Sequence, residues 1–368
     1  MSSAKQMRVG LSLEPLDTLF FRDGRPFEAA TQAASGLPQP QTVARALRTW
    51  LLRKAGCDFE KLGDAMRAGK SFTEAVAEEG QPGEASAVGQ LRFRGPWFAV
   101  DGGPAVPVPC ILHQVEDPDG RDARAPREIV RLTPLRNPSL PGWVPPEKGM
   151  LPLWLQDTRR AKRQEGYLRL SGLRKFLSGA VPQPSEILKR EELFDLDRRT
   201  GIVVHPESLA ADEGMIYAIS LLALRPEVSL YAEVVGPEET VKLFPEQATL
   251  LPLGGEGRHV TLKRVDPVTW PSASPKDNQG ALLVLATPAF FAEGWRPPNL
   301  ALTSAAVPGY VAVSGWDLAR GGPKPNRFAA AAGSVYFVNQ VGESLPDSLC
   351  EGEDAALGWG TCLQGVWS

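Results

Sequence analysis

Basic and aromatic residues stand close together in three segments of the chain. In chain order these residues are Phe20, Phe21, Arg22, Arg25 and Phe27, then Tyr167 within a basic run, then Trp316, Lys324, Arg327 and Phe328. Single-stranded RNA is bound by stacking of its bases on aromatic rings and by cations that contact its phosphates. These residue types therefore favour an RNA-binding surface, with packing in the hydrophobic core as the alternative for most of the rings.

The densest group of cations runs from Arg159 to Lys175. Its members are Arg159, Arg160, Lys162, Arg163, Arg169, Arg174 and Lys175, against only Asp157 and Glu165. The formal net charge of the chain is −3, so contact with nucleic acid depends on a local basic face and not on the total charge. We predict RNA contacts for Arg160, Lys162 and Arg163, with a solvated charged surface as the alternative.

Residues Thr42 to Lys54 predict an amphipathic helix. Its apolar stripe is Val43, Leu47, Trp50 and Leu51, and the arginines expected away from this stripe are Arg45, Arg48 and Arg53. Thr42 is the expected cap, and the first turn would offer N–H groups and a positive dipole end to a phosphate. The alternative is that the proline-rich approach at Pro38 and Pro40 simply separates two elements.

A glycine-rich loop, Leu253 to Arg258, follows a segment expected to be helical, Pro237 to Leu250. A dinucleotide-binding turn needs a strand before the loop and a helix after it, which is the reverse order. Glycines at 254, 255 and 257 allow close approach of a backbone, and Arg258 comes directly after them. The loop is a candidate for contact with an RNA backbone; a helix ending of the Schellman type is the alternative.

The remaining residues do not form a recognisable catalytic or metal site. The three histidines, His113, His205 and His259, are far apart in the sequence, and the four cysteines form no CxxC pair. Asp195 and Asp197 are the nearest approach to a two-metal carboxylate site, but Arg198 and Arg199 beside them indicate local ion pairing. We expect no catalytic residue, metal or cofactor, although His205 could still act with a lysine or tyrosine in a metal-free ribonuclease.

The elements that carry these residues predict an α+β protein. Gly 36 and Pro 34 make up about a fifth of the 368 residues, which indicates many turns and short strands. The first module is expected in the order strand, helix, strand, strand, helix, strand, with starting points near Met7, Thr42, Arg199, Val228, Pro237 and His259. That order is typical of the ferredoxin-like, or RRM-like, arrangement.

Two domains are therefore expected, residues 1–268 and residues 275–368. The first would carry a large insertion at about 56–195. The second has weak helical signal and is expected to be an incomplete ferredoxin-like module with strands at 282–286, 310–314, 334–338 and 361–367. No apolar stretch approaches the roughly 20 residues that cross a bilayer, so we expect a cytoplasmic protein without a membrane partner.

Five segments carry a resemblance to a known family. They are Pro15–Phe27, Pro38–Arg48, Arg199–Val204 with Glu213–Tyr217, Leu253–Arg258 and Gly333–Phe337. In this order they resemble the family of the third subunit of the Cmr complex, which is the type III-B CRISPR effector. That family belongs to the repeat-associated mysterious protein (RAMP) superfamily. Residues 56–195 contribute little to the resemblance.

The resemblance implies a subunit without nuclease activity that serves antiviral defence. It implies binding to the 5′ handle of the CRISPR RNA and docking against the large palm-domain subunit and the first backbone RAMP subunit. The matching positions imply RNA contacts for Arg22, Arg25, Thr42, Arg45, Arg48, Gly254, Gly255, Gly257, Arg258, Lys324 and Arg327. Gln39 and Gln41 depart from the small or proline residues common in the family, which leaves the geometry of the helix cap open.

Two other functions stay open on the sequence. The superfamily folds and His205 motivate a metal-independent endoribonuclease that processes CRISPR RNA. A protein adaptor, whose basic face binds an acidic neighbour, is the other.

Overall fold

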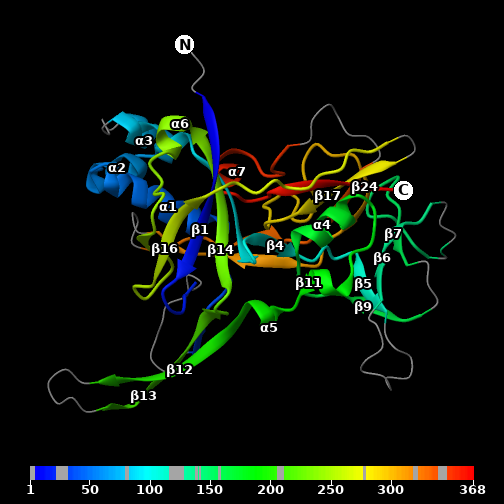
Figure 1. Ribbon diagram of the computed structural model, residues 1–368, viewed down its shortest axis with the longest axis horizontal. Helices are drawn as coiled ribbons and strands as arrows, with labels where there is room; N and C mark the ends of the chain where they lie inside the picture. Colours follow the sequence, from blue (N-terminus) through cyan, green and yellow to red (C-terminus); the bar gives the residue numbers. More distant parts are fainter. Residues whose placement is uncertain are drawn as a thin grey trace. The chain divides into compact units, whose positions relative to one another are not determined.

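The computed structural model describes residues 5–21, 32–78, 83–115, 128–136, 140, 142–155, 159–204, 211–276, 279–317, 322–338 and 346–368. Strands and helices are mixed along the chain (Figure 1), which confirms the α+β class. The chain divides into two compact units, each assembled from three segments. Unit 1 holds Met1–Pro96, Leu193–Pro267 and Ala312–Arg327, and unit 2 holds Trp97–Glu192, Val268–Val311 and Phe328–Ser368. The sequence led us to expect two domains that are each one continuous segment, 1–268 and 275–368, whereas each unit of the structure combines three separate segments.

In the main sheet of unit 1, β1 is a central strand with a neighbour on each side. In spatial order its strands are β3 (Arg92–Val100), β14 (Val228–Pro237), β1 (Gln6–Pro15), β16 (His259–Val265) and β15 (Thr249–Pro252). β1 pairs antiparallel with both neighbours, so that Leu11 lies between Ala232 and Arg264. The strand expected near Met7 is confirmed as β1, in which Val9, Leu11 and Leu13 point to one face and are buried.

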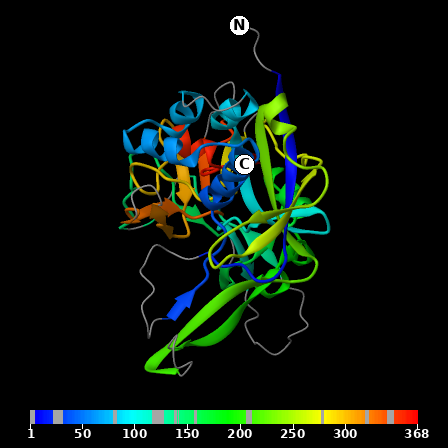
Figure 2. The ribbon, with the colours of Figure 1, turned by 90° about the vertical axis from the view of Figure 1, so that its left-hand side faces the viewer.

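Helices lie together on one side of this sheet (Figure 2). They are α1 (Pro40–Lys54), α2 (Phe59–Arg67), α3 (Phe72–Glu78), the 3-10 helix η1 (Gly83–Gln90) and the short α6 (Glu238–Val241). The apolar stripe predicted for α1 is confirmed, since Val43, Leu47 and Leu51 are buried. Trp50 of α1 stacks on Phe244 with ring centroids 6.2 Å apart, which fixes the helix against the segment after α6.

Two elements of unit 1 differ from the expected order. The strand expected at Arg199 belongs to a separate sheet, in which β12 (Phe194–Val204) and β13 (Ala211–Leu224) form a long hairpin and β2 (Gln32–Ala34) pairs with β13. The place beside β14 is taken by β3, from the stretch expected to be an insertion. The helix expected over 237–250 stops at α6, because Pro245 lacks the N–H that a longer helix needs and the chain then forms β15. In Figure 1 the β12–β13 hairpin extends beyond the sheet that contains β1.

Unit 2 contains a second sheet of four strands. Their spatial order is β18 (Leu302–Ala306), β23 (Val335–Val338), β17 (Gly280–Leu285) and β24 (Cys362–Trp367), and every pairing is antiparallel. All six residues of β17 are buried. The strands predicted for the second module are confirmed in β17, β23, β24 and β19 (Tyr310–Val313).

Helix α4 (Leu170–Leu177) packs against β24 in unit 2. A Cβ at Gly365 of β24 would lie 2.8 Å from both the Cα and the carbonyl oxygen of Leu177. Only glycine allows this approach of helix and strand. None of the helices in the described residues is long and apolar enough to cross a membrane.

The other elements are short. In chain order they are β4 (Gly103–Pro107), β5 (Leu112–Val115), β6 (Ile129–Arg131), β7 (Thr133–Pro134), β8 (Leu153–Trp154), β9 (Ala161–Arg163), β10 (Tyr167–Leu168), η2 (Pro184–Glu186), β11 (Ile187–Leu188), α5 (Arg190–Leu193), β20 (Trp316–Asp317), β21 (Gly322–Pro323), β22 (Arg327–Ala330) and α7 (Gly352–Ala356). Next to β3 in the same sheet come β4, then β10, then β11, while β9 pairs with β5.

Candidate nucleic-acid interface

The glycine-rich loop Leu253–Arg258 joins β15 to β16 as a strand-to-strand turn. Pro252 and His259 are the last paired residues of the two strands. The N–H of Leu253 then donates to the carbonyl of Arg258 at 2.9 Å, and the N–H of Arg258 donates to the carbonyl of Gly255 at 3.3 Å. The expectation that a helix leads into this loop is wrong, and with it the Schellman alternative, because the residues before the loop are a strand.

Backbone contact ties this loop to the segment that follows β1. The N–H of Gly255 donates to the carbonyl of Phe20 at 2.7 Å. Gly254 has φ +85, and a Cβ there would lie 2.5 Å from the same carbonyl oxygen. Only glycine combines this left-handed backbone with so close an approach. The predicted role of the glycines in close backbone approach is thus confirmed for Gly254, with Phe20 as the partner.

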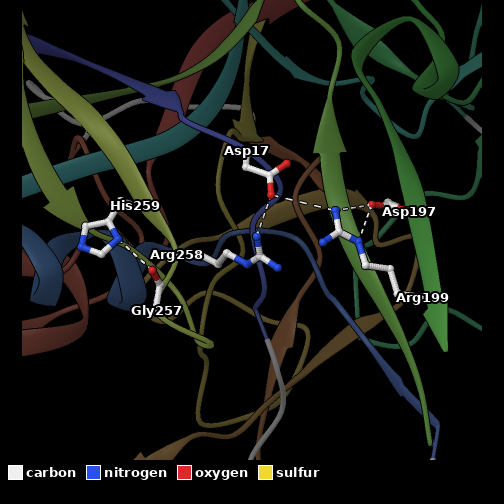
Figure 3. Close-up of polar contacts among 6 residues, drawn as sticks. All are labelled: Asp17, Asp197, Arg199, Gly257, Arg258 and His259. Atoms are coloured by element: carbon white, nitrogen blue, oxygen red, sulfur yellow. Dashed lines mark hydrogen bonds and ion pairs between the residues drawn. The ribbon is translucent and has the colours of Figure 1, made fainter. Parts of the chain in front are cut away.

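The Asp17 carboxylate lies between two arginines from separate elements of unit 1 (Figure 3). Its Oδ2 is 2.8 Å from Nη1 of Arg258 in the glycine-rich loop and 3.9 Å from Nη2 of Arg199 in β12. Arg199 also pairs with Asp197 of its own strand at 2.7 Å, as the predicted local ion pairing requires. We call Asp17, Asp197, Arg199 and Arg258 the Asp17 cluster.

A backbone hydrogen bond and the two arginines favour the charged form of Asp17. The pKa of Asp17 is lowered from its usual 3.8, chiefly by a hydrogen bond from the backbone N–H of Thr18; burial opposes this shift, and the positive charges of Arg258 and Arg199 each lower the pKa by a smaller amount. The side chain of Arg258 is 21% exposed, and that of Arg199 is 46% exposed. Both cations can therefore be reached by an anion in solution.

His259 lies at the start of β16, next to Arg258. Its Nδ1 is 2.7 Å from the carbonyl oxygen of Gly257 (Figure 3). A carbonyl can only accept a hydrogen bond, so Nδ1 carries a proton and donates it to Gly257. This contact fixes the orientation of the ring beside the loop.

Helix α1 corrects two of the predicted contacts. The helix begins at Pro40 with Gln39 as its N-cap, and the N–H of Thr42 is already bonded to the carbonyl of Gln39, so Thr42 is not the cap. Arg48 is only 3% exposed, and its guanidinium carbon lies 4.6 Å from the ring centre of Phe72. The expectation that Arg48 faces away from the apolar stripe is wrong, because this cation is buried against aromatic rings. Arg45 is exposed.

The basic stretch at 159–175 is largely neutralised within unit 2. Arg169 pairs with Asp101 at 2.8 Å, Lys175 pairs with Glu186 at 3.0 Å, and Arg159 pairs with Glu128. Of the three predicted RNA contacts, Arg163 lies 3.9 Å from Glu165. Arg160 directly precedes β9 and Lys162 lies within it. Both are exposed, and neither has an ion-pair partner among the described residues.

The aromatic residues separate into core and surface. Phe20 and Phe21 are buried, and Tyr167 packs edge-on against Phe98 with ring centroids 5.3 Å apart. Burial raises the pKa of Tyr167 to about 12. Phe328, in contrast, is 57% exposed. The alternative that the rings pack in the core is therefore confirmed for Phe20, Phe21 and Tyr167 and wrong for Phe328.

The other predicted residues lie at separate places. Arg327 is exposed in β22, and the backbone N–H of Lys324 donates to the carbonyl of Gly315 at 2.7 Å. Arg22, Arg25 and His205 lie outside the described residues. In the described ranges no three His, Cys, Asp or Glu side chains are grouped so that they could hold a metal ion.

Sequence reasoning missed Asp17 and Arg199 as members of the site. Asp17 lies 241 residues from its partner Arg258, so no local pattern links them. The only signal was that Asp17, Arg199 and Arg258 all belong to segments that carry the family resemblance.

Comparisons with known proteins point to one family. The sequence model described as CRISPR-associated protein (Cas_Cmr3) matches residues 11–367. A chain in the cryo-EM structure of the type III-B Cmr-beta bound to cognate target RNA and AMPPnP superimposes with a TM-score of 0.51 and 14% identity, covering 89% of this chain and 86% of that one. A chain in the structure of Cmr-beta bound to cognate target RNA gives the same values. A comparison with curated proteins found no match.

Replacing Gly254 by alanine is expected to cost more stability than replacing Gly257. Both residues have positive φ, but a Cβ at 257 meets no atom within 4 Å, whereas one at 254 collides with the carbonyl of Phe20. We expect losses of about 1 kcal/mol for Gly257→Ala and about 3 kcal/mol for Gly254→Ala in the free energy of unfolding. Urea unfolding of the two variants measures the difference, and equal losses would contradict the close approach of the loops.

The pKa of Asp17 is expected to rise in an Arg258→Ala variant, because one of the positive charges that lower it is removed while the Thr18 hydrogen bond remains. A depressed folded-state pKa means that the stabilisation from Asp17 is present above its unfolded value and lost as pH falls through the folded value. Carbon NMR of selectively labelled aspartate measures this pKa directly. Arg225→Ala, which removes a partner of Asp195, is the control and should leave Asp17 unchanged. An unaltered pKa of Asp17 in Arg258→Ala would contradict the claim that Asp17 interacts with Arg258 and connects it to Arg199.

Proposed function

Because the chain belongs to the Cas_Cmr3 family of CRISPR-associated proteins, we propose that it binds the 5′ handle of the CRISPR RNA in a type III-B effector complex without cutting RNA. The observation that carries this proposal is the Asp17 cluster beside the glycine-rich loop. Membership of the family supports a place in the effector complex. The Asp17 cluster supports RNA binding, because it places two arginines on the surface of unit 1, where they can contact the phosphates of an RNA chain.

The glycine-rich loop offers hydrogen-bond donors to a phosphate. The N–H groups of Gly254, Glu256 and Gly257 make no hydrogen bond within the described part of the chain. Glu256 and Gly257 have positive φ of 55 and 63, and such turns can direct successive N–H groups toward an anion. Arg258 follows at once, and Asp17 occupies its Nη1, which leaves Nη2 to donate to a phosphate oxygen.

The Asp17 cluster orders these cations before RNA binds. Arg258 and Arg199 would repel each other at close range, and the carboxylate between them offsets that repulsion. An arginine already held in one orientation loses less conformational entropy when it binds a phosphate. The predicted contacts that fit this function are Arg22, Arg25, Arg45, Arg160, Lys162, Arg163, Gly254, Gly255, Gly257, Arg258, Lys324 and Arg327, and to these we add Arg199. Arg48 and Thr42 are left out because their groups are buried or already bonded, and Gly255 contributes by holding the loop against Phe20, since its N–H already donates to that carbonyl.

We also propose that both sheets are ferredoxin-like. In unit 1 the strands β1, β3, β14 and β16 lie in the spatial order second, third, first, fourth, with α1 after the first and α6 after the third. In unit 2 the strands β17, β18, β23 and β24 repeat that order, with only the short α7 after the third. A βαββαβ unit with antiparallel neighbours has this order, so the second would be the incomplete copy expected from the sequence.

The proposed partners besides the CRISPR RNA are the large palm-domain subunit and the first backbone RAMP subunit. Family membership supports them, as it supports a role in antiviral defence and work in the cytoplasm.

Replacing Arg258 by alanine is expected to weaken binding of a single-stranded RNA that carries the handle. The slope of log affinity against log salt concentration should fall by about 0.7 for each lost phosphate contact. Fluorescence anisotropy at several salt concentrations measures both quantities. Arg67→Ala on α2 removes the same charge from a local pair with Asp64 and serves as the control. Equal affinity and slope in the two variants would contradict the proposal.

RNA incubated with the purified protein in the presence of a chelator is expected to stay intact, because the described residues bring no acid–base pair onto the Asp17 cluster beyond its ion pairs. Gel analysis of a labelled repeat RNA tests this. Site-specific cleavage that disappears in His205→Ala would support the metal-independent endoribonuclease instead.

A further inference from the structure

Two aromatic rings stand exposed together in unit 2. Tyr310 of β19 is 72% exposed and Phe328 of β22 is 57% exposed. Their ring centroids are 5.3 Å apart, and the ring planes meet at 86°. The two strands form a sheet of their own in the described part of the chain. Val313 and Ala329 of the same two strands are buried, so the ribbon has one covered face and displays the rings on the other.

The perpendicular arrangement leaves flat surface open. In an edge-to-face pair the edge of one ring points at the face of the other, so both faces of the first ring remain free. The second ring then forms a wall at a right angle to them. A flat, planar group can stack on the free face while its edge contacts the wall.

The charge of the surrounding chain favours an anionic ligand. Between Asp317 and Glu343 the sequence contains three basic residues, Arg320, Lys324 and Arg327, and no acidic residue. Arg327 directly precedes Phe328 in β22 and is exposed, on the opposite face of the strand, so it adds to the positive charge near the rings without contacting them. A ligand that combines a planar group with a negative charge fits both features, and a nucleotide is such a ligand.

The size of the ribbon also favours a nucleotide over a protein. β19 and β22 have four residues each, and the exposed apolar surface consists of two rings. A stable protein interface needs about 800 Å² from each partner, which two side chains cannot supply. One base needs a single ring face.

We propose that Tyr310 and Phe328 form a stacking site for one unpaired base of the bound RNA. This inference rests on the proposed function and extends it from phosphate contacts to a base contact. The site accepts any base, because stacking depends on the π-face and not on the hydrogen-bonding edge.

The test uses the full chain and a set of short single-stranded RNAs, each with one 2-aminopurine at a different position. Stacking on a ring quenches the fluorescence of this base, so wild-type protein should quench it strongly at one position. The double variant Tyr310→Leu, Phe328→Leu keeps apolar side chains but removes both rings. It should lose that quenching and bind about 5- to 100-fold more weakly, as loss of one stacked base predicts. The conservative variant Tyr310→Phe should behave as wild type.

Two outcomes would overturn the stacking site while leaving the proposed function standing. One is unchanged quenching and affinity in the leucine variant, with Arg258→Ala still weakening binding. The other is unchanged RNA binding in the leucine variant together with loss of its co-purification with another subunit, which would assign the rings to a protein contact. If wild-type protein binds no RNA, the proposed function falls and the stacking site falls with it.

Discussion

The carboxylate of Asp17 lies between two guanidinium groups that the chain brings from far apart, one in the loop before β16 and one in the β12–β13 hairpin. Two cations at this distance repel each other, and a flexible pair would spread apart in water. Asp17 offsets this repulsion together with Asp197, which pairs with Arg199 at 2.7 Å. The cost is that Asp17 competes with any incoming phosphate for the same donors. The surface therefore suits a multivalent ligand such as an RNA chain, which offers several phosphates at once.

The close approach of backbones makes this arrangement possible. Gly254 lets the glycine-rich loop contact the carbonyl of Phe20, only three residues beyond Asp17. The antiparallel pairing of β1 with β16 then sets where Arg258 leaves the sheet. The sheet of unit 2 repeats the strand order of unit 1 with fewer helices. This repetition supports two related modules, of which the first carries the charged cluster and the second carries the exposed rings.

Local patterns in the sequence predicted the elements better than their pairing. The strand that contains Val9, Leu11 and Leu13 and the apolar stripe of α1 follow from local patterns, and both were confirmed. The choice of β3 over β12 as the neighbour of β14 depends on contacts between distant residues, so the pattern could not show it. Arg48 was misplaced for a related reason, since a charge in a helix reads as exposed until Phe72 and Phe93 are known to surround it. Arg258 and the glycines were identified, but their partner Asp17 was not.

A crosslinking map of the CRISPR RNA onto this chain, made by ultraviolet irradiation of the assembled effector complex and read by mass spectrometry, tests the central claim most directly. If the Asp17 cluster and its neighbouring loop clasp the handle, peptides that contain residues 253–259 will carry crosslinked nucleotides from the 5′ end of the RNA. Crosslinks confined to other parts of the chain, or found only with nucleotides far from that end, would contradict the account.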